Sequence, residues 1–407
     1  MNAREFAIEV VKTLQAAGYQ ALWAGGCVRD QLVGRTPKDY DVATNATPDQ
    51  VREVFGNKRT LPIGASFGVI TVLGPKTADP IEVATFRRDG GYSDGRRPDA
   101  IEFTDAREDA IRRDFTINGM FFDPLKEQVL DYVGGQEDLV ARQIRAIGNP
   151  HERINEDKLR MLRGIRFAST FDFELEEQTL EAIRQHANEI TVVSGERIGA
   201  EMRRMLAGSN RAVAAKLLRA SGLLKEILPD GDSLYRDESQ WDHTLGCLNR
   251  LLLNDFGSAA SILLEPIVKM HGITPIFERW KLSNDERKSI EWVCKHWESL
   301  DRAADSPWSV IQPLMLKQDI DRALAVADSQ SETSSEGVVF CRQRLEWPRE
   351  KLDPPLILDG KGLIAMGVKP NPQFKSVLDS VRAAQLDDEI ATPEEAVALA
   401  KQMLGQL

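Results

Sequence analysis

The sequence predicts an α+β protein, with a mixed sheet and helices in its amino-terminal part and only helices after it. Segments in which apolar and polar residues alternate, as in strands, are concentrated before about residue 150. Helical spacing of apolar residues dominates from there to about residue 340, and a last helical unit covers roughly 355–405. With 407 residues, 42% of them hydrophobic, the chain is long enough for roughly two to four domains.

The first 150 residues contain the expected sheet. Residues 6–14 have helical spacing, and Thr47 as N-cap before Pro48 predicts a second helix through Phe55. Four short runs bounded by turn residues predict strands at 21–24, 39–44, 69–73 and 81–86. Their order predicts a small sheet with helices on one side.

Two polar stretches interrupt the helical part. Residues 229–233 predict a break, and residues 329–337, rich in Ser and Glu, predict a loop or linker. No apolar run approaches the roughly 20 residues that span a bilayer. The amino-terminal residues also lack the apolar stretch of a signal peptide. We therefore expect a cytoplasmic protein with no membrane partner.

The composition weighs against two kinds of site. The four cysteines are far apart and form no Cys-x-x-Cys pair, so neither a zinc site nor a disulfide framework is expected. The net charge of −11 lacks the basic surplus of many nucleic-acid-binding proteins. If the chain binds RNA, its basic residues must be gathered on one face.

A pair of carboxylates follows a glycine pair. Asp39 and Asp41 are two residues apart on a predicted strand, so they face the same side and can hold two hard cations. Gly25 and Gly26 allow the backbone to approach a triphosphate and donate N–H groups to it, and Arg29 can add a charged hydrogen bond. An Asp-x-Asp pair alone is a weak signal, because most such pairs are solvated, but the preceding glycines strengthen it.

Three further groups of residues suit a nucleotide. Glu82, on a later strand, is either a third metal ligand or a solvated strand residue. Residues 112–118 contain two arginines, Asp114 and Asn118, which suit a ribose and phosphates, because Asp114 can accept from a 2′-hydroxyl. The alternative for this second group is an ion-pair cluster at a helix end.

The third group, residues 156–167, contains Asp157 and Arg160 three residues apart on a predicted helix face. Cytosine and adenine both present an amine beside a ring-nitrogen acceptor, whereas uracil and guanine present a carbonyl beside an N–H. An Asp that accepts and an Arg that donates therefore match CTP and ATP and reject UTP and GTP. The alternative is a surface ion pair that contributes little.

Together and in this order, the clusters resemble the family of class II tRNA nucleotidyltransferases and bacterial poly(A) polymerases. The resemblance covers roughly residues 20–210 closely and the rest loosely. Residues 87–99 resemble the family's flexible loop, which helps to switch specificity from C to A. Residues 194–198 resemble the neck motif, which supports the base-reading helix.

The resemblance implies a domain order and a site. It implies a polymerase-beta-like nucleotidyltransferase head at 1–135, a helical neck with the base-reading helix at 136–205, a helical body at 206–335 and a helical tail that binds tRNA at 336–407. It implies two Mg²⁺ ions, CTP and ATP as substrates and the acceptor end of tRNA as partner. It implies Asp39 and Asp41 as metal ligands, Arg112 and Asp114 as sugar and phosphate contacts, Asp157 and Arg160 as the base-reading pair, and Arg87, Asp94, Arg96 and Arg97 in the flexible loop. With the residues argued above, the expected metal site is Asp39 and Asp41, with Glu82 either a third ligand or a solvated residue. The expected nucleotide site consists of Gly25, Gly26, Arg29, Arg112, Asp114, Asn118, Asp157, Arg160 and Arg163.

Within that family, addition of CCA to tRNA is the expected activity. The flexible loop has full length, whereas CC-adding enzymes are shortened there, and residues 61–68 lack the basic run associated with poly(A) polymerases. An A-adding-only enzyme comes second and a poly(A) polymerase third. A catalytically silent RNA-binding protein is the alternative outside enzymes, and the intact acidic residues argue against it.

Overall fold

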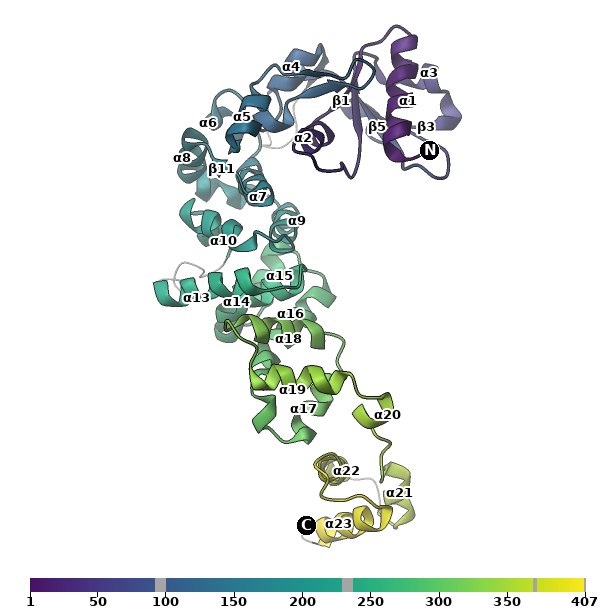
Figure 1. The fold of residues 1–407 in the computed structure, drawn as a ribbon, viewed down its shortest axis with the longest axis vertical. Helices are drawn as coiled ribbons and strands as arrows, with labels where there is room; N and C mark the ends of the chain where they lie inside the picture. Colours follow the sequence, from purple (N-terminus) through teal and green to yellow (C-terminus); the bar gives the residue numbers. More distant parts are fainter. Residues whose placement is uncertain (92–99, 229–236, 369–371, 406–407) are drawn as a thin grey trace. The chain divides into compact units, whose positions relative to one another are not determined.

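The fold comes from a computed structural model of the chain and is described for residues 1–91, 100–228, 237–368 and 372–405. A sheet-containing amino-terminal part is followed almost entirely by helices, which confirms the predicted α+β fold (Figure 1). The chain divides into two compact units, Met1–Met205 with Val213–Leu228 and Leu206–Ala212 with Pro229–Leu407. The finer division into head, neck, body and tail stays a prediction.

A seven-stranded mixed sheet forms the centre of the first unit. Its strand order is β3-β4-β5-β2-β1-β8-β9, in which β2 and β5 are parallel and the other neighbours are antiparallel. The strands are β1 (Ala21–Ala24), β2 (Asp41–Thr44), β3 (Thr60–Leu61), β4 (Val69–Val72), β5 (Ile81–Thr85), β8 (Phe121–Asp123) and β9 (Gln128–Leu130).

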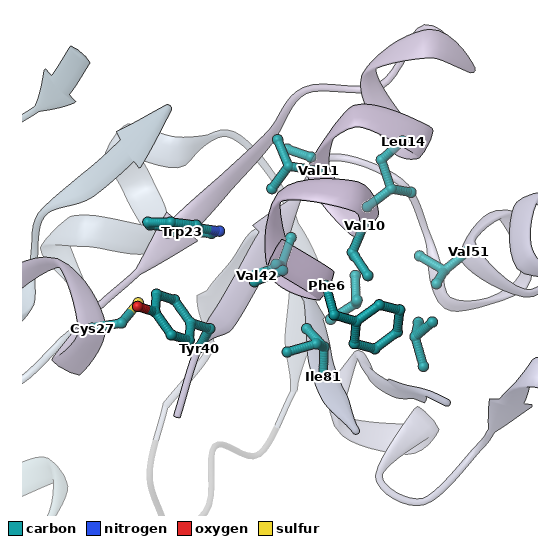
Figure 2. Close-up of a cluster of buried hydrophobic side chains, with 14 of the residues drawn as sticks. Phe6, Val10, Val11, Leu14, Trp23, Cys27, Tyr40, Val42, Val51 and Ile81 are labelled. Carbon is teal, nitrogen blue, oxygen red and sulfur yellow. The ribbon is translucent and has the colours of Figure 1, made fainter. Parts of the chain in front are cut away.

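Helices α1 (Ala3–Ala16) and α3 (Pro48–Phe55) pack on one face of this sheet. Apolar residues at helical spacing on α1, such as Phe6, Val10 and Leu14, are fully buried in one core with Trp23 of β1. Figure 2 shows these side chains together with others of the same core. Helix α3 begins as predicted, because Thr47 caps it.

The opposite face of the sheet is also covered, so the prediction of helices on one side only was wrong. Ala106 and Ala110 of α4 (Ala106–Ile111) pack there with Phe86 and Phe121. Successive residues of β1 point alternately into the two cores, which is the period of a strand covered on both faces. The sequence signal for α4 is short, because the helix has six residues.

The predicted strand at 39–44 is shorter than expected, since β2 begins at Asp41. Its partner β1 ends at Ala24, which pairs with Asp41, so no ladder partner from β1 remains for Asp39 and Tyr40. Tyr40 nevertheless points into the core, where its ring centroid lies 4.8 Å from that of Trp23.

The other elements of the first unit surround the sheet or follow it. The short ones are η1 (Asn57–Arg59), η2 (Ala65–Phe67), η3 (Thr116–Asn118), η4 (Ala187–Val192), the antiparallel pair β6 (Arg87–Asp89) and β7 (Ile101–Phe103), and the parallel pair β10 (Gln143–Ile144) and β11 (Glu174–Leu175). The helices are α2 (Gly26–Leu32), α5 (Gly135–Ala141), α6 (Pro150–Glu156), α7 (Arg160–Phe171), α8 (Glu177–His186), α9 (Gly195–Leu206), α10 (Arg211–Ala220) and α11 (Leu223–Ile227).

The described part of the second unit is helical. Its elements are α13 (Glu238–Arg250), α14 (Phe256–His271), α15 (Thr274–Trp280), α16 (Asn284–Asp301), η5 (Ala303–Asp305), α17 (Trp308–Met315), α18 (Ile320–Ser329), α19 (Glu336–Leu345), α20 (Arg349–Leu352), α21 (Gly360–Ala365), α22 (Pro372–Leu386) and α23 (Pro393–Gly405). The last three share a core of their own, which confirms the predicted terminal helical unit. Among the described helices, none is long and apolar enough to cross a membrane.

The predicted linker at 329–337 is a short loop. Helix α18 ends at Ser329 and α19 begins at Glu336, and both helices pack against α16. The polar residues 329–337 therefore connect two packed helices. One of them, Ser335, is the N-cap of α19. The predicted break at 229–233 lies outside the described residues.

Candidate active site

A cavity of about 600 Å³ in the first unit brings together the turn between β1 and α2, the segment after α4, and helix α7. Its volume suits a small-molecule ligand. Seven of the described lining residues are arginines and three are aspartates, so the walls favour an anion such as a triphosphate. The lining residues are Gly25, Gly26, Arg29, Asp41, Arg112, Arg113, Asp114, Asn118, Asp157, Arg160, Arg163, Arg166, Phe167 and Arg204.

Gly25 shapes the turn that enters the cavity. Its φ of 69° lies in the left-handed region, and a Cβ at this position would lie 2.9 Å from Nη1 of Arg113. The prediction that Gly25 donates its N–H to a triphosphate was wrong. This N–H donates to the carbonyl of Met120 at 3.2 Å and is not free for a phosphate. Gly26 begins α2 and lines the cavity beside it.

Arg29 lines the cavity from α2, where other side chains hold its guanidinium. Nη1 donates to Oδ1 of Asn118 at 2.6 Å, and Nε and Nη2 donate to Oδ1 of Asp30 at 2.9 and 2.7 Å. The guanidinium also lies 4.5 Å from the ring centroid of Phe171. These bonds use three of its five N–H donors, so some hydrogen-bonding capacity remains for a phosphate.

Two acidic residues of the predicted metal site, Asp41 and Glu82, lie on neighbouring strands. Asp41 begins β2 and lines the cavity, and the parallel pairing of Val42 with Val83 places Glu82 beside it. Desolvation and then the charges of Asp39 and Glu82 raise the pKa of Asp41 to about 6, against the opposing charge of Arg113.

Mutually repelling carboxylates of this kind fit a divalent cation, which prefers oxygen ligands. Asp39 is exposed and lies just before the strand, and it is not among the described residues lining the cavity. Within the described ranges, no group of three or more His, Cys, Asp or Glu side chains is arranged around one metal position.

The segment after α4 brings Arg112, Arg113 and Asp114 to the cavity, as the sequence predicted. Both arginines pair with Asp109, which is only 1% exposed and which the sequence reasoning missed. Its spacing of three and four residues from the arginines on a helix is the signal that identifies it. The ion-pair cluster that was posed as the alternative is therefore present, and its two arginines also line the cavity.

Asp114 is buried, and its carboxylate has many partners. Oδ2 accepts from Nε and Nη2 of Arg163 at 2.8 and 2.5 Å, and Oδ1 accepts from the Phe115 N–H at 2.8 Å and from Nδ2 of Asn118 at 3.1 Å. Burial raises the pKa of Asp114, but the Arg163 guanidinium and these hydrogen bonds outweigh it and hold the pKa at about 2. The four bonds fill roughly the four acceptor positions of a carboxylate.

Asp157 and Arg160 both line the cavity, but they are not neighbours on one helix face as predicted. Asp157 lies between α6 and α7 with φ −150° and ψ 105°, which is extended backbone, and Arg160 begins α7. Asp157 accepts from Nη1 and Nη2 of Arg197 at 3.1 and 2.7 Å and from the Leu159 N–H at 3.1 Å. Arg197 belongs to the segment predicted to support the base-reading helix.

Arg160 has a partner that was not predicted. Its Nη1 donates to Glu156 Oε2 and, at 2.9 Å, to the carbonyl of Arg153, and its Nη2 donates to the carbonyl of Arg112 at 3.2 Å. Glu156 also pairs with Arg153 at 2.5 Å. Glu156 ends α6 and Arg160 begins α7, with extended backbone at Asp157 between them, so helical spacing alone does not explain this contact.

Two further arginines of the cavity, Arg166 and Arg204, were also missed. Both are held by Glu201, which is 2% exposed, at 2.5 and 2.9 Å. Arg166 packs over the ring of Phe167 at 3.9 Å from its centroid. Neither Arg204 nor Glu201, both on α9, carries a sequence signal that points to a nucleotide.

Of the predicted flexible-loop residues, only Arg87 is described. It lies on β6, where Nε donates to Oδ1 of Asp89 at 3.0 Å and its backbone N–H donates to Asp109 Oδ1 at 3.2 Å. Arg87 is not among the described residues lining the cavity. Asp94, Arg96 and Arg97 lie outside the described residues.

Known proteins resemble this chain in sequence and in fold. Residues 21–145 match a family described as the poly A polymerase head domain, and residues 172–234 match one described as a probable RNA and SrmB-binding site of polymerase A. The CCA-adding enzyme of Levilactobacillus brevis is 31% identical over 404 residues, which cover 97% of each chain. The CCA-adding enzyme of Enterococcus faecalis is 44% identical over 211 residues, 52% of this chain and 51% of that one.

A solved structure also resembles the whole chain. The crystal structure of Bacillus stearothermophilus CCA-adding enzyme in complex with CTP has a TM-score of 0.81 and 26% identity, covering 99% of this chain and 98% of that one. The fold is that of a nucleotidyltransferase. The Levilactobacillus brevis enzyme is more than 30% identical to this chain, and the match covers 97% of each chain. The chain therefore belongs to the family of CCA-adding enzymes, as the predicted resemblance indicated.

Proposed function

We propose that this chain adds CCA to the 3′ end of tRNA, using CTP twice and then ATP, without a nucleic-acid template. One observation carries the proposal: a single cavity is lined by Asp41, by the arginines after α4 and by Asp157 with Arg160. A carboxylate for metal, cations for a triphosphate and a donor–acceptor pair for a base therefore line one cavity.

The nucleotide-reading part of the proposal rests on free hydrogen-bonding capacity. Asp157 receives three hydrogen bonds, and a carboxylate has about four acceptor positions, so roughly one remains for the amine shared by cytosine and adenine. Arg160 uses three of its five N–H donors in the contacts described above, which leaves donors for the ring nitrogen. Arg197 and Glu156 hold the two side chains in place before a nucleotide arrives.

The family is divalent-metal dependent, and we propose two Mg²⁺ ions held by Asp39 and Asp41, with Glu82 as a possible third ligand. When bound, the ions would supply activation of the attacking 3′-hydroxyl and neutralisation of the pyrophosphate. The arginines of the cavity bind and orient the triphosphate, and the buried walls around Asp114 fix the sugar. Because Asp114 has no acceptor position to spare, a ribose hydroxyl displaces one of its present donors.

The remaining parts of the proposal concern tRNA and location. We assign tRNA binding to the tail, residues 336–407, and keep the head at 1–135, the neck at 136–205 and the body at 206–335. The acceptor end must then reach the cavity so that its terminal hydroxyl meets the α-phosphate. A cytoplasmic location remains part of the proposal.

Three tRNA substrates test the proposal, ending before, within and after the CC sequence. Each is incubated with radiolabelled CTP or ATP separately and then with both. The proposal predicts C addition to the first two and A addition only after CC is complete. Addition of A alone would identify an A-adding-only enzyme, repeated A addition would identify a poly(A) polymerase, and no incorporation would indicate a silent RNA-binding protein.

A further inference from the structure

Asp109 is a buried carboxylate that reaches no open surface but holds two arginines of the cavity. Its Oδ1 accepts from Nε and Nη2 of Arg112 at 2.9 and 2.7 Å, and its Oδ2 accepts from Nε and Nη2 of Arg113 at 3.1 and 2.9 Å. Oδ1 also accepts from the Arg87 N–H at 3.2 Å. Each oxygen thus binds one guanidinium through two N–H groups, an arrangement that fixes orientation as well as distance.

These five hydrogen bonds fill the acceptor capacity of a carboxylate, and Asp109 is not among the described lining residues. It therefore cannot act on a substrate directly. Burial raises the pKa of Asp109, but the guanidiniums of Arg113 and Arg112 outweigh that effect and hold the pKa below its ordinary value. The carboxylate stays charged and keeps both partners.

The arginines that Asp109 holds connect to other parts of the site. Nη1 of Arg113 donates to the carbonyl of Asn118 at 3.2 Å and packs against the Gly25 turn. The carbonyl of Arg112 accepts from Nη2 of Arg160. Each guanidinium keeps N–H groups that are not bonded to Asp109, because Asp109 uses only Nε and Nη2.

We propose that Asp109 is a positioning residue for the triphosphate, which sets the guanidiniums of Arg112 and Arg113 in the orientation that binds phosphate. This inference rests on the proposed function, because it requires a nucleoside triphosphate in the cavity. Without Asp109, Arg112 keeps the Arg87 carbonyl, 3.0 Å from its Nε, and Asp89, 3.6 Å from its Nη1, and Arg113 keeps the Asn118 carbonyl. The two cationic side chains are then less constrained, and a bound triphosphate must order them.

The sign of the effect separates positioning from simple electrostatics. Asp109 is a negative charge beside the cavity, so its neutralisation makes the region more positive. If net charge alone determined affinity, Asp109→Asn would bind a triphosphate more tightly. If orientation determines it, the same substitution weakens binding, because an amide accepts through one oxygen only and its NH₂ group faces a guanidinium.

The experiment measures binding of CTP, ATP and inorganic triphosphate to the full chain by calorimetry. Asp109→Asn should weaken all three by the same factor, about ten- to hundredfold, the value of one charged hydrogen bond. Asp109→Glu, which keeps the charge but moves it, should also weaken them. Asp123→Asn is the matched control, since Asp123 is 3% exposed in the same unit and accepts mainly from backbone N–H groups.

A double-mutant comparison completes the test. Adding Asp109→Asn to the Arg112→Ala, Arg113→Ala double variant should cause little further loss, because the groups that Asp109 positions are already gone. Unchanged or tighter binding by Asp109→Asn and Asp109→Glu, or a loss confined to one nucleotide, would overturn the inference alone. A wild-type chain that binds neither CTP nor ATP would overturn the proposed function as well.

Discussion

Replacing Asp157 by alanine should relax the choice of nucleotide while the fold survives. The substitution removes the proposed acceptor for the base amine and frees Arg197 from its ion pair. The two side chains of that pair are 17% and 21% exposed, so water can reach the freed guanidinium. We therefore expect intact secondary structure and a modest fall in stability.

The size of the effect follows from one lost contact. A hydrogen bond to a charged group contributes about 1.5–3 kcal/mol, and leaving the partner unpaired adds to the difference between the right and wrong base. At about 1.4 kcal/mol per decade, Asp157→Ala should lower the preference for CTP over UTP by roughly one to two decades. ATP over GTP should change in the same direction, because adenine and cytosine share the amine.

The assay is single-nucleotide incorporation with each of the four nucleoside triphosphates. Wild type is compared with Asp157→Ala and with Asp172→Ala. Asp172 is a suitable control because it pairs with Arg142 in an exposed bridge, with side chains 65% and 60% exposed. The control should match wild type. If Asp157→Ala also matches it, base selection lies in residues other than those assigned.

Three further outcomes are expected. Asp39→Ala or Asp41→Ala should abolish incorporation with unchanged circular dichroism, and turnover near the wild-type rate in either folded variant would refute the metal assignment. Glu156→Gln should reduce CTP and ATP incorporation about tenfold, because Arg160 loses its charged partner; an unchanged rate in the same assay would mean that the two carbonyl contacts suffice. Folding lowers the pKa of Asp114 from its ordinary value. The contribution of this carboxylate to folding stability is therefore fully present when the pH is above the ordinary pKa, and it is lost as the pH falls toward the folded-state pKa. The stability advantage of wild type over Asp114→Asn, about 2 kcal/mol, should therefore shrink between about pH 4 and pH 2. Urea unfolding at each pH measures this difference, and an advantage independent of pH would contradict the assignment.

Where the chain carries strong local signals, the sequence predicted the fold well. Thr47 and Pro48 determine where α3 begins, and the turn at Gly25 ends β1 as expected. The strand at 39–44 was predicted too long, because its length depends on the strand beside it. The helix on the second face of the sheet was not predicted, because α4 has only six residues and shows no clear helical spacing of apolar residues.

The candidate site was predicted in its composition but not in its pairing. All nine nucleotide residues assigned from the sequence line one cavity, since each cluster combines charge with a recognisable spacing. The partner of Asp157 is Arg197, forty residues later, and a contact of that separation depends on the tertiary fold. Asp109 differs, because it is about one helical turn from the two arginines that it holds.

The most direct test of the account is whether the protein alone selects the base. Calorimetric titration of the wild-type chain with CTP, ATP, UTP and GTP, in the presence of Mg²⁺ and without any RNA, measures that selection. CTP and ATP should bind at least about tenfold more tightly than UTP and GTP, because only their bases match Asp157 and Arg160. Equal affinity for all four nucleotides would contradict it.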